Sequence, residues 1–328
     1  VKVVRQHPEN PDLLFVGMER GIYVSLDRGE SWTSLRGTNL PPVSVRGIKI
    51  QRDYNDLVIG THGRGAWILD DLQPLVELSE AADRDVHLFA MRTATDWERW
   101  GRTSNLGQSV FVGENPEPGA WVNYWLSGDA AESLDGAVTV RITDSGGALV
   151  KEFTDDDAGP GFNRAVWDLR WAGAEPIPGE EGGGGFFFGN SGPPAVPGTY
   201  TATLVVDGEE RSTSFELRGD PNVNATQADY VARYEAAVRA RDLQTRLNRM
   251  VGAMGEVNTQ IDGLLEAVEG KDMANEDRIR ETAELAKEAL TTLEAEVRRP
   301  EGSMNYRDWP RLAEQLRFVV RGIEGAQA

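Results

Sequence analysis

The residues of this sequence that could perform acid–base chemistry are aspartates in its first quarter. Two carboxylates held across a pocket are the usual equipment for hydrolysing a glycosidic bond, and the candidates are Asp27, Asp53, Asp56, Asp70 and Asp71. The chain contains 53 acidic residues, so closely spaced acids are expected from abundance alone, on solvated faces or as turn caps. The sequence therefore supplies candidates but leaves the catalytic residues unknown.

A second stretch with chemical potential is Thr61-His62-Gly63-Arg64-Gly65. It follows an apolar strand pattern, so His62 and Arg64 are candidates for a ligand contact at the edge of a sheet. The two glycines also suit a tight turn in which the histidine is simply hydrogen-bonded. Both interpretations stay open.

The sequence indicates no metal centre and no cofactor. It contains no cysteine, which excludes disulfides and thiolate metal sites. His7, His62 and His87 are far apart, without the spacing of metal ligands. The acidic run at residues 155–157 lacks the spacing of a defined calcium loop, and we interpret it as a solvated surface.

Composition narrows the class of protein. The 328 residues carry a net charge of -19, and 40% of them are hydrophobic, including nine Trp and ten Phe. That is enough for two or three folded domains. The acidity argues against nucleic acid or an anionic membrane as a partner. We expect no transmembrane segment, because no apolar run reaches the roughly 18 residues of a membrane span.

The stretch that organises the N-terminal region runs from Ser25 to Trp32 and has the pattern S-x-D-x-G-x-x-W. Asp27 can accept backbone N–H bonds inside a turn. Gly29 can supply the positive φ that a tight hairpin needs, and Trp32 can pack its ring over the turn. These four residues are therefore predicted to brace a hairpin rather than to perform a reaction.

This pattern resembles the Asp-box, or BNR repeat, of bacterial neuraminidases, sortilin-type receptors and related β-propellers. In these families the box braces the outer part of a blade, away from the central pocket. A sialidase-like site would also need several arginines converging on a carboxylate, with a tyrosine nucleophile and an acid. Arg46 and Arg64 are only two, so the resemblance implies architecture more than chemistry.

Residues 1–75 contain two similar units about 44 residues apart, a period typical of one four-stranded propeller blade. Residues 10–17 and 54–60 each lead into an Arg-Gly turn and a second apolar strand. A closed propeller needs about four to eight blades. We therefore expect residues 1–75 to be the last, incomplete blades of an Asp-box propeller, with the missing N-terminal blades in the same or a separate chain.

Residues 76–105 are interpreted as a connector and residues 106–220 as a β-sandwich. About seven short alternating strands in the latter segment are typical of an immunoglobulin-like or fibronectin-like fold. Within it, Trp167 and Tyr200 are predicted to be core aromatics. Arg164 and Asp168 are interpreted as a solvated or cross-strand pair.

Two stretches of this sandwich, residues 161–170 and 197–201, resemble bacterial secreted proteins that place such a sandwich after an Asp-box propeller. A loop of four glycines followed by Phe186, Phe187 and Phe188 interrupts it. The three rings either fold back onto the protein or form an exposed hydrophobic contact for a partner.

Residues 221–328 change to a helical period. One apolar seam has alternating steps of four and three residues, typical of heptads: Leu243, Leu247, Met250, Met254, Val257, Ile261, Leu264 and Val268. Similar seams run through residues 279–297 and 309–323, with breaks at Gly270 and at residues 299–302. We predict an antiparallel three-helix bundle whose first helix is the longest.

Together these patterns predict a multidomain protein, mainly β plus α: terminal β-propeller blades, an immunoglobulin-like β-sandwich and a C-terminal helical bundle, residues 221–328. In domain order it resembles the C-terminal part of bacterial sortilin-like proteins that are often labelled glycosyl hydrolases. The resemblance implies a secreted, periplasmic or cell-surface protein, non-catalytic, with the propeller as a surface for a protein or glycan ligand and the C-terminal domains for assembly. Two alternatives stay open: a sialidase-like or glucanase-like hydrolase with its carboxylates on blades outside this chain, and a subunit of a larger extracellular complex.

Overall fold

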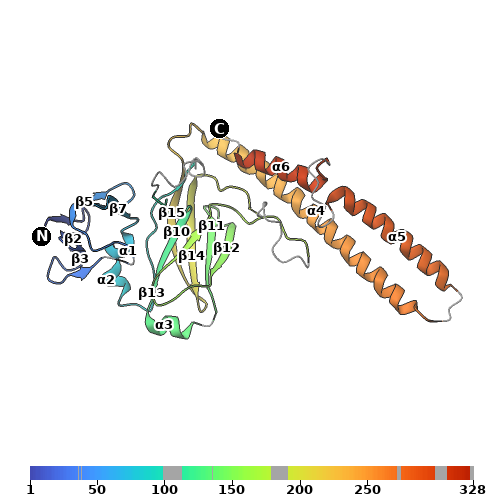
Figure 1. Ribbon diagram of the computed structural model, residues 1–328, viewed down its shortest axis with the longest axis horizontal. Helices are drawn as coiled ribbons and strands as arrows, with labels where there is room; N and C mark the ends of the chain where they lie inside the picture. Colours follow the sequence, from blue (N-terminus) through green and yellow to red (C-terminus); the bar gives the residue numbers. More distant parts are fainter. Residues whose placement is uncertain are drawn as a thin grey trace. The chain divides into compact units, whose positions relative to one another are not determined.

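The chain forms two compact units in the computed structural model: one contains the strands with three short helices, and the other contains the three long helices (Figure 1). The β unit comprises residues 1–169 and 197–222, and the helical unit comprises residues 170–196 and 223–328. The structure describes residues 1–35, 37, 39–98, 113–134, 136–178, 191–271, 275–299 and 309–325. The protein is therefore a mixed β and α protein, as the sequence predicts.

The N-terminal part of the β unit consists of two small antiparallel sheets with their strands in chain order. The first sheet contains β1 (Val3–Gln6), β2 (Leu14–Met18), β3 (Gly21–Ser25) and β4 (Thr33–Ser34), and the second contains β5 (Val45–Gln51), β6 (Asp56–Thr61) and β7 (Ala66–Leu69). Apolar residues at alternate positions of both sheets form one common core. Phe15, Ile22 and Leu57 are fully buried in it. Two short helices follow, α1 (Gln73–Val76) and α2 (Leu78–Ala81).

Each small sheet also keeps apolar residues on the side opposite the common core. Val4 on β1 pairs with Val16 and is 52% exposed, and Ile68 on β7 pairs with Val58 and is 59% exposed. Successive residues of a strand point to opposite faces. The neighbours of Val4 and Ile68, namely Val3 and Trp67, pack against the core, so Val4 and Ile68 face away from it.

The rest of the β unit is built on two further sheets. One has the order β13-β10-β8 and the other the order β12-β11-β14-β15-β9. Their members are β8 (Val86–Leu88), β9 (Ala94–Asp96), β10 (Ala120–Leu126), β11 (Val138–Asp144), β12 (Leu149–Asp155), β13 (Gly161–Trp167), β14 (Gly198–Val206) and β15 (Glu209–Gly219), with α3 (Gly128–Ser133) after β10. The buried rings of Trp167 and Tyr200, 5.1 Å apart, join the two sheets. The prediction that both are core aromatics is confirmed.

The expected connector, residues 76–105, is in part integral to these sheets. β8 pairs antiparallel with β10, and β9 pairs parallel with β15. Each is only three residues long, too short to show an alternating pattern in the sequence. β8 and β9 are therefore parts of the later sheets, and residues 1–169 and 197–222 form one compact unit.

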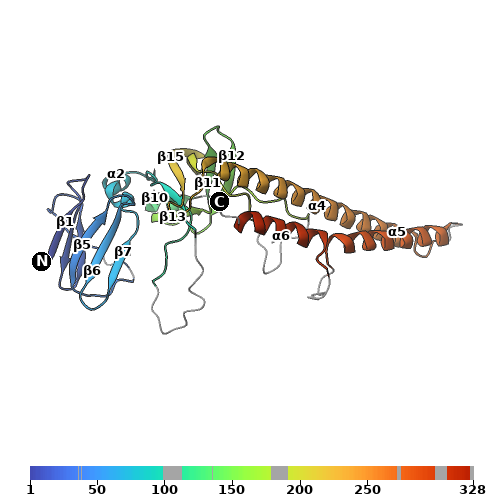
Figure 2. The same cartoon turned by 90° about the horizontal axis from the view of Figure 1, so that it is seen from above.

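The helical unit contains α4 (Gln227–Val268), α5 (Glu276–Val297) and α6 (Leu312–Gly325). α4 begins with a reciprocal pair of bonds between Thr226 and Asp229. α5 packs along the C-terminal half of α4 and α6 along its N-terminal half, with little contact between α5 and α6 (Figures 1 and 2). The three helices are therefore a long hairpin with a tandem second arm, and the expected three-helix bundle is wrong in that respect.

The predicted heptad seam of α4 contains both buried and exposed residues. Leu247, Met254 and Val268 are buried. The intervening positions are exposed, with fractions of 50%, 39%, 42% and 48% at Leu243, Met250, Val257 and Leu264. A helix with one neighbouring layer instead of two buries only part of a wide apolar stripe. Over the described ranges no helix is long and apolar enough to cross a membrane.

Candidate functional site

The Ser25–Trp32 turn connects β3 to β4 and is closed by its own side chains. Ser25 Oγ donates to Asp27 Oδ1 at 2.7 Å, and the Ser31 N–H donates to the same oxygen at 2.9 Å. Gly29 has φ 95°, and its carbonyl accepts from the Trp32 indole N–H at 3.0 Å. The backbone bond to Asp27 and the positive φ of Gly29 are those that the sequence predicts for a braced hairpin, whereas the Ser25 hydroxyl and the Trp32 indole add bonds that were not predicted.

Hydrogen bonds to the Asp27 carboxylate lower its pKa to about 2. The largest contributions come from the hydroxyl and the backbone N–H of Ser31, followed by the Ser25 hydroxyl. Donors that bind the ionised form stabilise it over the protonated form. A carboxylate so held is a poor proton donor near neutral pH, so Asp27 acts as a brace.

The stretch at residues 61–65 forms the turn between β6 and β7. Its two glycines have positive φ, 86° at Gly63 and 68° at Gly65, and the Thr61 hydroxyl donates to the Gly65 carbonyl at 2.6 Å. The His62 backbone N–H donates to Ser44, while the side chains of His62 and Arg64 are exposed. The turn is therefore closed by backbone groups, which leaves both side chains open to solvent.

His62 belongs to a charged end of the two small sheets. Lys2 Nζ is 2.9 Å from a carboxylate oxygen of Glu19. This contact, with smaller contributions from Arg46 and His62, lowers the pKa of Glu19. Arg46 and His62 thus lie near the carboxylate that Lys2 contacts, and we call Lys2, Glu19, Arg46 and His62, with Arg64 of the same turn as His62, the basic end.

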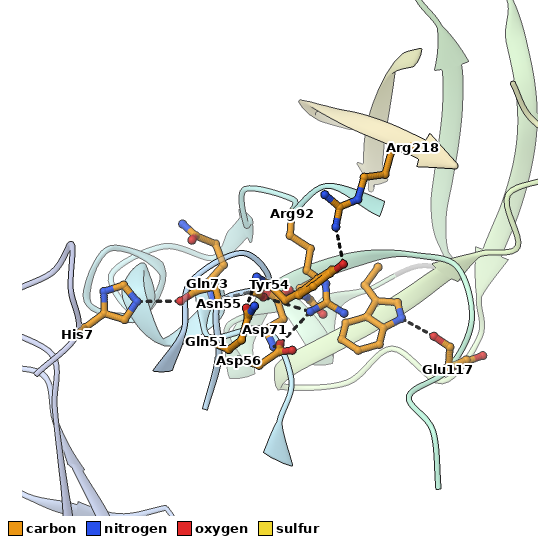
Figure 3. A network of polar contacts seen from close by, with 12 residues as sticks. His7, Gln51, Tyr54, Asn55, Asp56, Asp71, Gln73, Arg92, Glu117 and Arg218 are labelled. Atoms are coloured by element: carbon orange, nitrogen blue, oxygen red, sulfur yellow. Dashed lines mark hydrogen bonds and ion pairs between the residues drawn. The ribbon is translucent and has the colours of Figure 1, made fainter. Parts of the chain in front are cut away.

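A second cluster of charge lies between the N-terminal sheets and the later strands of the β unit (Figure 3). We call it the junction network, and its members are Tyr54, Asp56, Asp71, Arg92, Trp121, Asn123, Arg164 and Arg218. Arg92 Nη1 donates to Asp56 Oδ1 at 2.9 Å and to the Tyr54 carbonyl. The same Asp56 oxygen accepts from the Asp71 N–H at 2.8 Å.

Asp71 is the buried centre of this network. It adopts φ 60°, and its carboxylate accepts from the Gln73 N–H, at the start of α1, and from Asn123 Nδ2 at 2.8 Å. Asn123, also buried, accepts in turn from Arg164 Nε at 2.8 Å. A continuous chain of bonds therefore connects α1 through β10 to β13.

Aromatic rings complete the contacts of the arginines. The guanidinium carbons of Arg92 and Arg164 lie 4.3 Å and 3.9 Å from the Trp121 ring centroid, within the range of favourable cation–π contacts. At the other end, Arg218 on β15 donates to the Tyr54 hydroxyl and to Thr95. Figure 3 shows Arg92 directed at Asp56 and Arg218 directed at Tyr54, each pair from separate segments of the chain.

Burial is the largest cause of the raised carboxyl pKa values in and beside the junction network. Desolvation raises the pKa of Asp71, and desolvation with the nearby Asp56 charge raises the pKa of Asp70. A raised carboxyl pKa is typical of a general acid. The oxygens of Asp56 and Asp71, however, are directed at donors of the protein itself, so the arrangement stabilises the β unit instead of presenting a catalytic pair.

Several other predicted residues lie apart from both clusters. Asp53 accepts from Gln51 in an exposed turn. Asp168 does not pair with Arg164 but accepts from Lys151 Nζ at 2.7 Å, a correction to the expected Arg164–Asp168 pair. Asp155 accepts from the Tyr124 hydroxyl, and burial followed by that bond raises the pKa of Tyr124, so this tyrosine stays neutral. Phe186, Phe187 and Phe188 lie outside the described residues.

No group of three or more metal-binding side chains occurs in the part of the chain that the structure describes. No family model matches the sequence, and no curated protein matches it. The geometry of the β unit therefore carries the functional argument.

Sequence reasoning missed most of the junction network. Arg92 lies in the expected connector and Arg218 at the end of a predicted strand, without a motif to mark either. Asn123 did give a signal, because it is a single amide within the apolar run of β10. A buried polar residue needs a hydrogen-bond partner, and that requirement identifies Asn123 as a network position.

Proposed function

We propose that this chain is part of a non-catalytic binding and scaffold protein that presents the basic end to an anionic ligand. The supporting observation is that Lys2 contacts Glu19, and that Arg46 and His62 lie near enough to lower the pKa of Glu19 further, in a chain of net charge -19. A local cluster of basic side chains on a protein of negative net charge attracts anionic groups to that part of its surface. Carboxylated or sulfated glycans are the ligand class that this chemistry favours.

We further propose that the two small sheets are propeller blades of the Asp-box type, followed by an immunoglobulin-like sandwich. Three features support this: each sheet is an antiparallel meander, the two share one core, and their outer faces keep Val4 and Ile68 exposed. Sheets that stack as blades bury both faces, so further blades, in the same or a separate chain, would cover these residues. The braced turn at Asp27 fits the same architecture.

The junction network supports the scaffold part of the proposal. Arg92 and Asn123 occupy the carboxylates of Asp56 and Asp71, and the residues involved come from the N-terminal sheets and the later strands alike. Such a network fixes the ligand-bearing sheets to the rest of the β unit. A hydrolase is the second candidate: donors of the protein occupy the Asp71 carboxylate, but burial and the nearby Asp56 charge raise the pKa of Asp70 as a general acid requires.

Titration calorimetry with carboxylated, sulfated and neutral oligosaccharides, with reducing ends measured in parallel, tests the proposal. We expect binding of the anionic sugars without release of reducing ends. The Arg46→Ala/Arg64→Ala variant should bind at least about 10-fold more weakly, since each charged contact contributes about 1 kcal/mol or more. Arg52→Ala, an exposed arginine in the β5–β6 turn, is the matched control and should bind normally.

Two results would contradict the proposal in distinguishable ways. Equal affinity of the Arg46→Ala/Arg64→Ala variant would show that the basic end is not the ligand surface. Release of reducing ends that is lost in Asp70→Asn or Asp71→Asn would establish the hydrolase instead.

A further inference from the structure

The helical unit has a continuous apolar surface that none of its own described helices covers. Most residues of this surface follow a more buried residue by three positions: Met250 follows Leu247 and Val257 follows Met254 on α4. On the second arm, Leu293 follows the partly buried Leu290 on α5, and Val319 follows the partly buried Leu316 on α6; Leu293 and Val319 are 48% and 55% exposed.

These residues lie on one side of the hairpin. Three positions correspond to about 300° of rotation at 3.6 residues per turn, which is the same offset, in the same sense, on every helix. α5 and α6 run antiparallel to α4, and in antiparallel neighbours equal offsets from the facing line lie on the same side of the pair. We call this surface the open face, defined by Leu243, Met250, Val257, Leu264, Leu293, Leu312 and Val319.

The opposite flank of α4 is covered by the chain itself. Glu175 forms an ion pair with Arg249, and the Glu175 carbonyl accepts from Asn248 Nδ2 at 2.6 Å. Pro178 lies so close to Gly252 that a Cβ atom there would be 2.7 Å from its Cδ. The covered flank therefore contains a glycine that allows close approach of Pro178, together with specific polar contacts to Glu175. The open face instead carries large apolar side chains.

The size of the open face suits a specific interface. From Leu243 to Leu264 it spans about 32 Å at 1.5 Å per residue, and it is two helices wide at roughly 10 Å each. A standard interface buries about 800 Å² per partner. An exposed apolar surface of this extent is characteristic of an interaction site.

The charge along the hairpin identifies the occupant. The first 24 residues of α4 contain five arginines and three acids, whereas the last 18 contain three acids and no basic residue. α5, packed on that acidic half, has seven acids against three basic residues. α6, packed on the basic half, is balanced, and Arg298, Arg299 and Arg311 flank it.

We infer that a second copy of this chain covers the open face, with the two hairpins antiparallel. In this arrangement the basic half of each hairpin meets the acidic half of the other, and the same apolar surface serves both copies, as a two-fold axis requires. A parallel arrangement would place like charges together. The inference rests on the helical unit alone and stands whether or not the β unit binds an anionic glycan.

Sedimentation of the full chain tests the association. We expect a dimer at micromolar concentration, with its dissociation constant raised at least roughly 100-fold in Met250→Glu/Val257→Glu. Both positions are already exposed in one copy, and circular dichroism will show whether the helices persist. Phe318→Glu is the matched control: it is 58% exposed but two residues from inward-facing Leu316 and Val320, on the outer side of α6, so it should leave the dimer intact.

Because the chain has no cysteine, single cysteines report the orientation directly. Ala253→Cys, midway along the open face, should link to itself through a short bis-maleimide. Leu243→Cys should link only when mixed with Leu264→Cys. A monomer at all concentrations, or a dimer unaffected by Met250→Glu/Val257→Glu, would overturn the inference, and efficient self-linking of Leu243→Cys would overturn the antiparallel arrangement.

Discussion

The β unit buries charged and amide side chains, whereas the helical unit leaves large apolar side chains exposed. In the junction network, Asp71 and Asn123 are buried and bonded to each other. On the open face, Leu243 and Leu264 are about half exposed. The two units therefore depart from the usual distribution of polarity in opposite directions.

This difference in burial indicates which unit satisfies its interactions with its own residues and which unit leaves a surface for a partner. Buried polar groups are tolerated when their hydrogen bonds are satisfied within the fold, and the junction network meets that requirement with its own residues. A large contiguous apolar surface, by contrast, usually marks a site that a partner covers. The β unit thus contains both the donors and the acceptors of its buried polar network. The helical unit contains only one of the two surfaces that an apolar interface needs.

The strongest test of this comparison is Arg92→Ala, which removes one half of the polar interface. It leaves Asp56 without its ion pair and removes one of the two cation–π contacts of Trp121, since Arg164 keeps the other. Loss of one partner of a fully buried pair costs about 3–5 kcal/mol. Because the Arg92 and Asp56 side chains are 24% and 18% exposed, we expect about 2–3 kcal/mol, measured by urea unfolding. Arg52→Ala is the exposed control, and an equal loss in both would contradict the network.

Asp71→Ala should have the next largest effect. It removes the acceptor of a buried Asn123 amide, at a cost of about 1–3 kcal/mol. Burial raises the folded-state pKa of Asp71 above its ordinary 3.8, so the native state binds a proton more readily than the unfolded state. The stability that wild type owes to this group therefore rises as pH falls through the raised pKa, and is constant below 3.8.

Urea unfolding of wild type and Asp71→Ala at pH 7 and pH 5 measures this linkage. The free-energy difference between the two proteins should widen at the lower pH. A difference that narrows would mean that donors to the Asp71 carboxylate outweigh its burial.

Glycine-to-alanine changes in α4 have a smaller expected effect, and they distinguish the part of one flank that residues 170–178 cover, at Gly252, from a part of the same flank that no other described segment contacts, at Gly263. A Cβ at Gly263 meets nothing within 4 Å, so Gly263→Ala should stabilise the helix by about 0.5–1 kcal/mol. The same change at Gly252 would place the Cβ 2.7 Å from Pro178, which offsets the gain in helix propensity. Thermal unfolding should rank Gly263→Ala above wild type and Gly252→Ala at or below it, and the reverse order would mean that residues 170–178 do not pack on α4.

The sequence predicted those parts of the molecule whose interactions are local. The bonds of the Ser25–Trp32 turn lie within eight consecutive residues, and their pattern was visible. The junction network joins residues from Tyr54 to Arg218, which only the tertiary fold brings together. The heptad spacing of α4 predicted a helix with a wide apolar stripe, but it could not reveal that α5 and α6 cover one side of that stripe in tandem.

The smallest expected effect is confined to that local turn, and it tests whether a predicted motif is also self-sufficient. The folded-state pKa of Asp27 is about 2, below its ordinary 3.8. Its stabilisation is therefore present above 3.8 and is lost as pH falls through about 2. Hydrogen exchange at the Ser31 amide should show wild type losing protection between these pH values. Asp27→Asn should be less protected at pH 6 and nearly independent of pH below 4. Asp53→Asn, whose bond to Gln51 lies in another turn, should keep the wild-type profile; if it instead behaves like Asp27→Asn, the loss of protection is global and the turn has no stability of its own.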